Sequence, residues 1–209
     1  MTKTITRVYE DIASAEDTVR ELVGAGLGAS HIGLVASNAE GWHRPGAHSV
    51  SPIHDKDRDG KDDRAEGAAT GGGLGAILGG AAGAAAGLGM IAIPGIGPVV
   101  AAGWLSALAA GAVGGGVAGG LIGALVESGT SKENAELYAE AVRRGGAIVT
   151  AKVSDDDEKQ YTAIMDHRCY DVGARANTWR GEGWRGYDPN APVFTADEIR
   201  REREIYHRP

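Results

Sequence analysis

The sequence predicts an α+β fold: a ferredoxin-like sandwich of about four strands, interrupted by a long apolar α-helical hairpin rich in Gly and Ala. Two observations support this prediction. Strand and helix patterns alternate near both ends of the chain, in residues 1–36 and 127–180. Between them, residues 67–126 contain no charged side chain, and 20 of these 60 residues are Gly and 17 are Ala. Residues 37–66 are predicted to form a polar acidic linker, and residues 181–209 a polar tail with a short C-terminal helix.

The first half of the predicted domain is a β-α-β unit. Apolar and polar side chains alternate over Thr4–Tyr9, which is typical of a strand. The stretch from Asp11 to Ser14 offers an N-cap, and apolar residues then recur at helical spacing until the glycines of residues 24–28. The short apolar run Ile32–Ala36 predicts the second strand.

The second half of the predicted domain repeats this alternation. Ser131 is typical of an N-cap, and the helix that follows it is expected to stop at Gly145 and Gly146. Alternating β-branched residues over Ala147–Val153 predict a third strand, and Asp155–Arg168 predicts an amphipathic helix. A fourth, weaker strand is predicted over Ala174–Trp179.

The polar tail carries a helix-start signal. Thr195 to Glu198 has the pattern of a capping box, which predicts a short charged helix ending near Glu204. Two arrangements remain open for the tail: it either lies over its own domain or reaches a neighbouring subunit.

Residues 67–126 are predicted to form two helical arms, Thr70–Ile93 and Pro98–Val126, joined by a turn at Ile93–Pro98. Each arm is long enough to span a bilayer. Small residues recur at a spacing of four, which predicts a smooth stripe suited to close helix packing. The predicted packing residues are Gly71, Gly75, Gly79, Gly83 and Gly87 in the first arm, and Gly103, Gly111, Gly115, Gly119 and Gly123 in the second.

Three settings for this hairpin are open: a membrane, a core shared by the hairpins of several subunits, or a hairpin folded back on its own domain. The absence of charge favours the membrane, whereas the few Leu, Ile and Val residues in the first arm disfavour insertion. Trp104 is either an interfacial anchor or a core residue. No ionisable residue marks an ion path, so a packing role is expected and not a channel.

A candidate Ca²⁺ loop lies in the acidic linker. The segment matches the D-x-D-x-D-G spacing with an acid at position twelve, and the candidate ligands are Asp55, Asp57, Asp59, Asp63 and Glu66. Asp62 at position eight and four interleaved basic residues depart from the pattern, so a solvated charge run is the alternative. Ca²⁺ is the one cofactor that the sequence suggests.

Other candidate sites have simpler interpretations. The linker histidines His43, His48 and His54 are expected to be solvated, and Cys169 is expected to be a half-buried structural thiol. Arg143 and Arg144, at a predicted helix C-terminus, complement the helix dipole and would meet anionic lipid if they faced a membrane. With a net charge of −7, the chain has no electrostatic support for a nucleic-acid partner.

The chain resembles the bacterial general stress or heat-induced stress protein domain (YflT-type). The residues that carry the resemblance are Thr6–Tyr9, Ile32–Ala36, Ala92–Pro98, Tyr138–Gly146 and Tyr187–Pro189. The resemblance implies induction by stress, implies no enzyme activity, and supplies no functional residues.

The sequence therefore predicts a non-enzymatic stress-response protein that is anchored in, or associated with, the inner membrane through a glycine-zipper hairpin, with the α+β domain in the cytoplasm. The alternative is a soluble, cytoplasmic structural protein that homo-oligomerises through the hairpin. The expected partner is a further copy of the chain, with membrane lipid as a second partner in the membrane setting.

Overall fold

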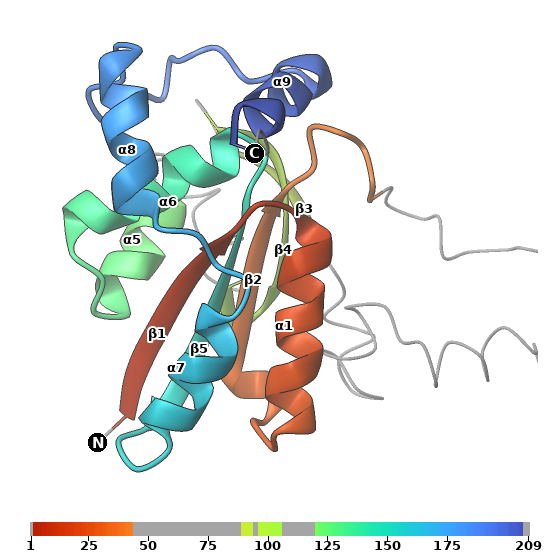
Figure 1. Ribbon diagram of the computed structural model, residues 1–209, viewed down its shortest axis with the longest axis vertical. Coiled ribbons are helices and arrows are strands. Elements are labelled where there is room, and N and C mark those ends of the chain that lie inside the picture. Colours follow the sequence, from red (N-terminus) through yellow and green to blue (C-terminus); the bar gives the residue numbers. More distant parts are fainter. Residues whose placement is uncertain (1, 44–88, 94–95, 106–119, 207–209) are drawn as a thin grey trace, which may run out of the picture.

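The computed structural model describes residues 2–43, 89–93, 96–105 and 120–206 (Figure 1). This part of the chain has a mixed α+β fold built on an antiparallel sheet, as the sequence predicted. Its elements, in chain order, are β1 (Thr2–Tyr9), α1 (Ile12–Gly24), η1 (Ala29–His31), β2 (Ile32–Ser37), β3 (Gly89–Ile93), β4 (Gly97–Gly103), α5 (Gly120–Glu127), α6 (Lys132–Arg143), β5 (Ala147–Ser154), α7 (Glu158–Asp166), α8 (Val172–Gly181) and α9 (Ala196–Tyr206).

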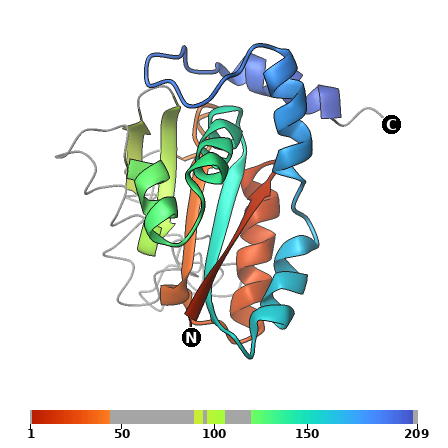
Figure 2. The ribbon, with the colours of Figure 1, turned by 90° about the vertical axis from the view of Figure 1, so that its left-hand side faces the viewer.

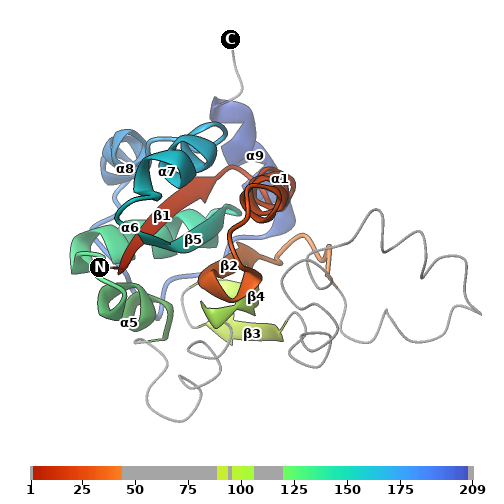
Figure 3. The same cartoon turned by 90° about the horizontal axis from the view of Figure 1, so that it is seen from below.

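The sheet has five strands in the order β1-β5-β2-β4-β3, and every neighbouring pair is antiparallel. Strand β5 lies between β1 and β2, with Ile148 opposite Val8 on one side and Val35 on the other. The unit β1-α1-β2 is therefore a split β-α-β unit, because β1 and β2 run in the same direction with an antiparallel strand between them. Figure 3 shows the strands following one another from β1 to β3 in this order.

Helices cover both faces of the sheet, and each face forms its own apolar core. Helices α1 and α7 pack on one face, and α5, α6 and α8 pack on the other (Figure 2). Alternate residues of the strands point to opposite faces, so β5 contributes Val149 to the first core and Ile148 to the second. Both β5 side chains are fully buried, so β5 contributes to the core on each face of the sheet.

Helix caps confirm most of the predicted helix starts. The Asp11 side chain accepts a hydrogen bond from Ser14 N at 2.8 Å and begins α1. Ser131 caps α6 in the same way through Asn134 N. The capping box before α9 is formed as predicted, because Thr195 N donates to Glu198 Oε2 at 2.8 Å and Glu198 N donates back to Thr195 Oγ1 at 3.3 Å.

The helical arms predicted for residues 67–126 are wrong wherever the structure describes strands in this segment. Residues 89–93 and 97–103 form β3 and β4, which extend the sheet next to β2. The predicted turn does lie between them: Ile96 N donates to Ile93 O at 3.0 Å, and Gly97 adopts a positive φ of 109°. Because this segment supplies two strands, a ferredoxin-like sandwich with a helical hairpin fits the fold only loosely.

The prediction of transmembrane helices is contradicted in the part of the chain that the structure describes. None of the described helices is both long and apolar enough to cross a bilayer. In the second predicted arm, the structure describes a helix over Gly120–Glu127 (α5).

The predicted packing glycines lie in different environments where the structure describes them. Gly103 ends β4, where a Cβ would lie 2.0 Å from Ile32 O, so it permits close contact between strands and not between helices. Gly123 lies exposed on α5, and a Cβ there would meet nothing within 4 Å. The remaining members lie outside the described residues: Gly71, Gly75, Gly79, Gly83, Gly87, Gly111, Gly115 and Gly119.

The fourth predicted strand, Ala174–Trp179, is helical and belongs to α8. The Asp171 side chain starts this helix by accepting hydrogen bonds from Gly173 N and Ala174 N. Ala176 and Trp179 are buried, and their spacing of three places both on one helix face. The predicted strand is therefore wrong, because burial here follows the helical period.

Candidate functional site

The C-terminal segment, residues 182–206, lies over its own domain, which selects one of the two arrangements left open by the sequence. Ile199 of α9 is fully buried against Gly145, where a Cβ would come within 2.3 Å of Ile199 Cγ2. Arg203 donates to Gly145 O at 3.1 Å and pairs with Glu40 at 2.8 Å. The segment therefore packs on the end of α6 and on the loop after β2.

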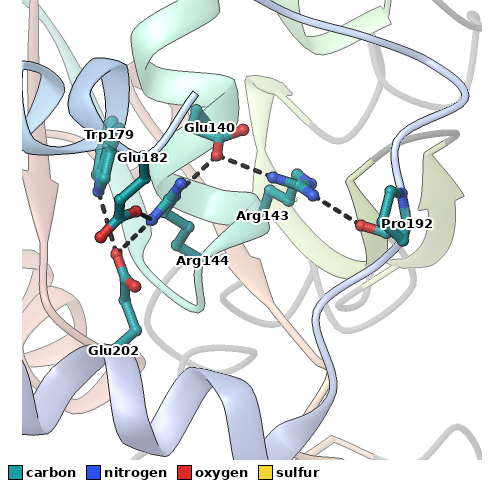
Figure 4. A network of polar contacts seen from close by, with 7 residues as sticks. All are labelled: Glu140, Arg143, Arg144, Trp179, Glu182, Pro192 and Glu202. Carbon is teal, nitrogen blue, oxygen red and sulfur yellow. Dashed lines mark hydrogen bonds and ion pairs between the residues drawn. The ribbon is translucent and has the colours of Figure 1, made fainter. Parts of the chain in front are cut away.

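A polar cluster, the Arg144 clasp, joins this segment to α6. It consists of Glu140, Arg143, Arg144, Trp179, Glu182 and Glu202 (Figure 4). Arg144 contacts three carboxylates: Glu140 at 2.7 Å, Glu182 at 2.9 Å and Glu202 at 2.7 Å. Trp179 Nε1 also donates to Glu202, at 3.1 Å. The clasp thus links α6, α8 and α9 around one guanidinium group.

The charge of Arg144 is buried, and hydrogen bonds to carboxylates stabilise it. Only 8% of its side chain is exposed. Burial disfavours the charged form, but the hydrogen bonds that Arg144 donates to Glu140, Glu202 and Glu182 outweigh this effect and raise the pKa of Arg144 above its ordinary value. The clasp therefore contains a permanent cation, and its loss would leave Glu140 with Arg143 and Glu202 with Trp179 as their remaining partners in a buried setting.

Arg143 fixes the middle of the C-terminal segment. Its guanidinium donates to Glu140 at 2.9 Å and to Pro192 O at 2.8 Å, and it lies 4.5 Å from the ring centre of Phe194. Next to Pro192, Val193 covers Gly97 at the start of β4, where a Cβ would lie 2.4 Å from Val193 Cγ1. The segment therefore reaches from the end of α6 to the β3–β4 connection.

A cavity of about 510 Å³ lies beside the clasp. This volume is within the usual range for small-molecule sites. Arginines, carboxylates and aromatic rings line it together, among them Arg185, Trp184, Tyr187 and Asp188. Arg143 and Arg144 already pair with carboxylates or with the backbone, so a polar ligand would have to compete with these contacts.

The predicted metal site cannot be placed, because Asp55, Asp57, Asp59, Asp63 and Glu66 all lie outside the described residues. Within the described ranges, no group of three His, Cys, Asp or Glu side chains is arranged to hold a metal ion. Ca²⁺ binding by the acidic linker stays a prediction.

His43 differs from the prediction of a solvated linker histidine. It is 9% exposed, and Asn38 holds its backbone: His43 N donates to Asn38 Oδ1 and Asn38 Nδ2 donates to His43 O, both at 2.9 Å. The ordered domain therefore continues past β2 into the first residues of the predicted linker. His48 and His54 lie outside the described residues.

Cys169 is half-buried, as predicted. Burial and the neighbouring carboxylate of Asp166 raise the pKa of its thiol, which lowers the fraction of reactive thiolate. Trp104 is partly buried against the core, and Lys152 Nζ lies 3.9 Å from its ring centre. This favours the core interpretation of Trp104 over the membrane anchor.

The two edge strands of the sheet differ in chemistry. β1 carries Lys3 and Arg7, which pair with acids of α7, and Tyr170 N donates to Val8 O at its end. β3, with the sequence Gly-Met-Ile-Ala-Ile, has neither charge nor proline, and among the described strands it pairs only with β4. Charges and prolines normally protect edge strands from pairing with another chain. The β3 edge is thus the second candidate site.

The sequence located the cationic end of the clasp but not its partners. Arg143 and Arg144 were expected only to complement a helix dipole, whereas Glu182 and Glu202 lie 38 and 58 residues further along the chain from Arg144. The β3 edge was missed because its residues were assigned to a helix. No protein-family model matches the chain, and no curated protein or solved structure is significantly similar to it.

Proposed function

We propose that the protein is a non-enzymatic structural protein of the stress response, and that it assembles with copies of itself through residues 67–126. The observation that carries this proposal is β3: this segment supplies an edge strand without the charges that normally prevent pairing between chains. The stress-response role is inferred from the resemblance of the chain to the general stress protein domain.

The burial of β4 beside β3 supports this proposal. Val99, Val100 and Ala101 of β4 are almost completely buried, so β4 is part of the core and holds β3 at a fixed position. Residues held by a packed sheet are arranged for association in advance, and this lowers the entropy lost on binding. In this proposal β3 is therefore an interface whose backbone the core already positions, and its partner is a second copy of the chain. The proposed setting is the cytoplasm.

Sedimentation of the intact chain without detergent tests the proposal. We expect species that are multiples of 21.4 kDa and that dissociate on dilution. A monomer at every concentration would contradict the proposal, as would a chain that stays dispersed only in detergent. Deleting residues 67–126 is not a suitable variant, because it removes the buried strand β4.

A substitution on α5 tests the role of the small-residue stripe separately. Gly123→Leu is suitable because a Cβ at Gly123 meets nothing within 4 Å, so the domain itself can accept it. Gly24→Leu is the control, since Gly24, the last residue of α1, is also an exposed helical glycine whose added Cβ would meet nothing within 4 Å. If the stripe is a contact surface, only Gly123→Leu weakens the assembly; equal sedimentation of both variants would restrict the interface to β3.

A further inference from the structure

The position of Pro98 shows which backbone groups of β3 point out of the sheet. Asn38 N donates to Pro98 O at 2.8 Å, so Pro98 faces the β2 side of β4. In an antiparallel sheet the N–H and C=O groups of one residue point to the same side, and successive residues alternate. Pro98 therefore makes no backbone hydrogen bonds to β3.

The register of β3 on β4 determines which β3 residues direct their backbone groups out of the sheet. Pro98 lies opposite Ala92, and Val100 lies opposite Met90. Because Pro98 and Val100 face β2, their partners Ala92 and Met90 direct their own N–H and C=O groups away from β4. Ile91, between them, faces β4. The outer edge of β3 thus presents four backbone groups that no described strand pairs.

We propose that two copies of the chain join through β3 in antiparallel pairing about a two-fold axis at Ile91. In this register Met90 of each copy lies opposite Ala92 of the other, and all four outward backbone groups form hydrogen bonds. Two sheets of five strands then become one sheet of ten. This interface rests on the proposed self-association and specifies the residues that carry it.

The chemistry of β3 fits a second copy. In a two-fold pairing about Ile91, a charge at position 91 would face its own copy, and a charge at a neighbouring position would lie diagonally across from a like charge. β3 carries none, although the whole chain has a net charge of −7. The other edge strand, β1, brings Lys3 and Arg7 and would place like charges in the same interface.

Cysteine crosslinking tests the register directly. In a Cys169→Ser background an introduced residue is the only cysteine. Two copies of Ile91 would lie opposite each other with Cα atoms ~4.5 Å apart, close enough for a disulfide. Two copies of Gly89 would be offset by four residues, or ~14 Å along the strands. We expect copper-phenanthroline to link Ile91→Cys chains into dimers at least about tenfold faster than Gly89→Cys chains.

Ala92→Pro is a second, independent variant. It removes an outward N–H that β4 does not use, and proline is tolerated at such edge positions. We expect this variant to keep the circular dichroism spectrum and melting temperature of the monomer but to lose the dimer. Retention of the dimer by a folded Ala92→Pro chain would overturn the β3 interface.

The outcomes of these experiments distinguish the β3 interface from the proposed self-association on which it rests. Fast crosslinking through Ile91 but not through Gly89, together with loss of the dimer in Ala92→Pro, supports the interface. Sedimentation that shows assembly, with equal or no crosslinking at the two positions, overturns the interface but leaves self-association in place. A wild-type chain that sediments as a monomer overturns both.

Discussion

At the scale of single residues, Arg144 is a buried cation that joins the C-terminal segment to the end of α6. It combines near-complete burial with three carboxylate partners from two different segments. Removing one partner from a buried ion pair is more costly than never forming it, because the remaining charges stay buried without compensation. The stability of the C-terminal segment should therefore depend on this residue far more than on the exposed arginines of α9.

Arg144→Met is expected to lower the free energy of unfolding by about 3 kcal/mol, because Glu140 and Glu202 would keep their buried positions without this cation. Arg200→Met is the matched control: Arg200 pairs with Asp197 on the surface, and such a pair contributes only about 0.5 kcal/mol. Urea unfolding followed by tryptophan fluorescence measures both. Equal losses in the two variants would show that the clasp adds no stability.

Tyr9 predicts a loss of stability in alkali. Its side chain is fully buried, and its hydroxyl donates to Met165 O at 2.9 Å. Burial raises the pKa of Tyr9 above its ordinary value of 10.0. Above pH 10 the unfolded chain therefore releases the phenol proton of Tyr9, whereas the folded protein still keeps it. The contribution of the neutral phenol to the free energy of unfolding is complete below pH 10 and is lost as the pH rises above this value.

Denaturant titrations at several pH values check this expectation. The free energy of unfolding should fall with rising pH above about 10, and Tyr9→Phe should reduce the slope because no phenol remains to ionise at that position. Tyr206→Phe removes a less buried phenol and should leave most of the slope. If the slope is unchanged in Tyr9→Phe, groups other than Tyr9 cause the fall in the free energy of unfolding at high pH.

At the scale of elements, patterns confined to a few neighbouring residues predicted the structure best. The alternating patterns of β1 and β5 and the short apolar run of β2 predicted these strands, and Asp11 and Ser131 cap their helices through contacts three residues away. β3 and β4 were missed because a spacing of four among small residues suggests helix packing, whereas β4 pairs with the distant strand β2 and β3 pairs with β4. The Arg144 clasp likewise depends on distant residues, which local patterns do not reveal.

Gly145→Ala tests how α9 is docked on the end of α6. Gly145 has a φ of +95°, and a Cβ there would clash with Ile199. The positive φ costs about 1–2 kcal/mol for alanine, and the clash adds about 1–3 kcal/mol. Gly129→Ala is the control, because Gly129 has a φ of +99° but no atom within 4 Å of the added Cβ.

The two variants should differ in stability and in the protection of the C-terminal segment. Gly145→Ala is expected to be the less stable, and limited proteolysis should cut its C-terminal segment faster than in Gly129→Ala. Identical cleavage rates would mean that the contact between Ile199 and Gly145 does not hold α9 in place.

At the scale of the whole molecule, the two edges of the sheet differ in charge and in how far they are covered. The β1 edge is charged and partly covered, whereas the β3 edge is uncharged and belongs to the Gly- and Ala-rich segment. The same segment that suggested a membrane hairpin thus provides two strands of the sheet. The C-terminal segment, through Val193 on Gly97, packs against the connection that positions β3.

Amide hydrogen exchange of β3, measured by NMR on the intact chain below and above its association midpoint, tests this account most directly. The Ile91 amide faces β4 and should be protected at both concentrations. The Met90 and Ala92 amides should exchange rapidly in the dilute monomer and become protected in the concentrated sample. Rapid exchange of Met90 and Ala92 at both concentrations would contradict the claim that copies of the chain pair through β3.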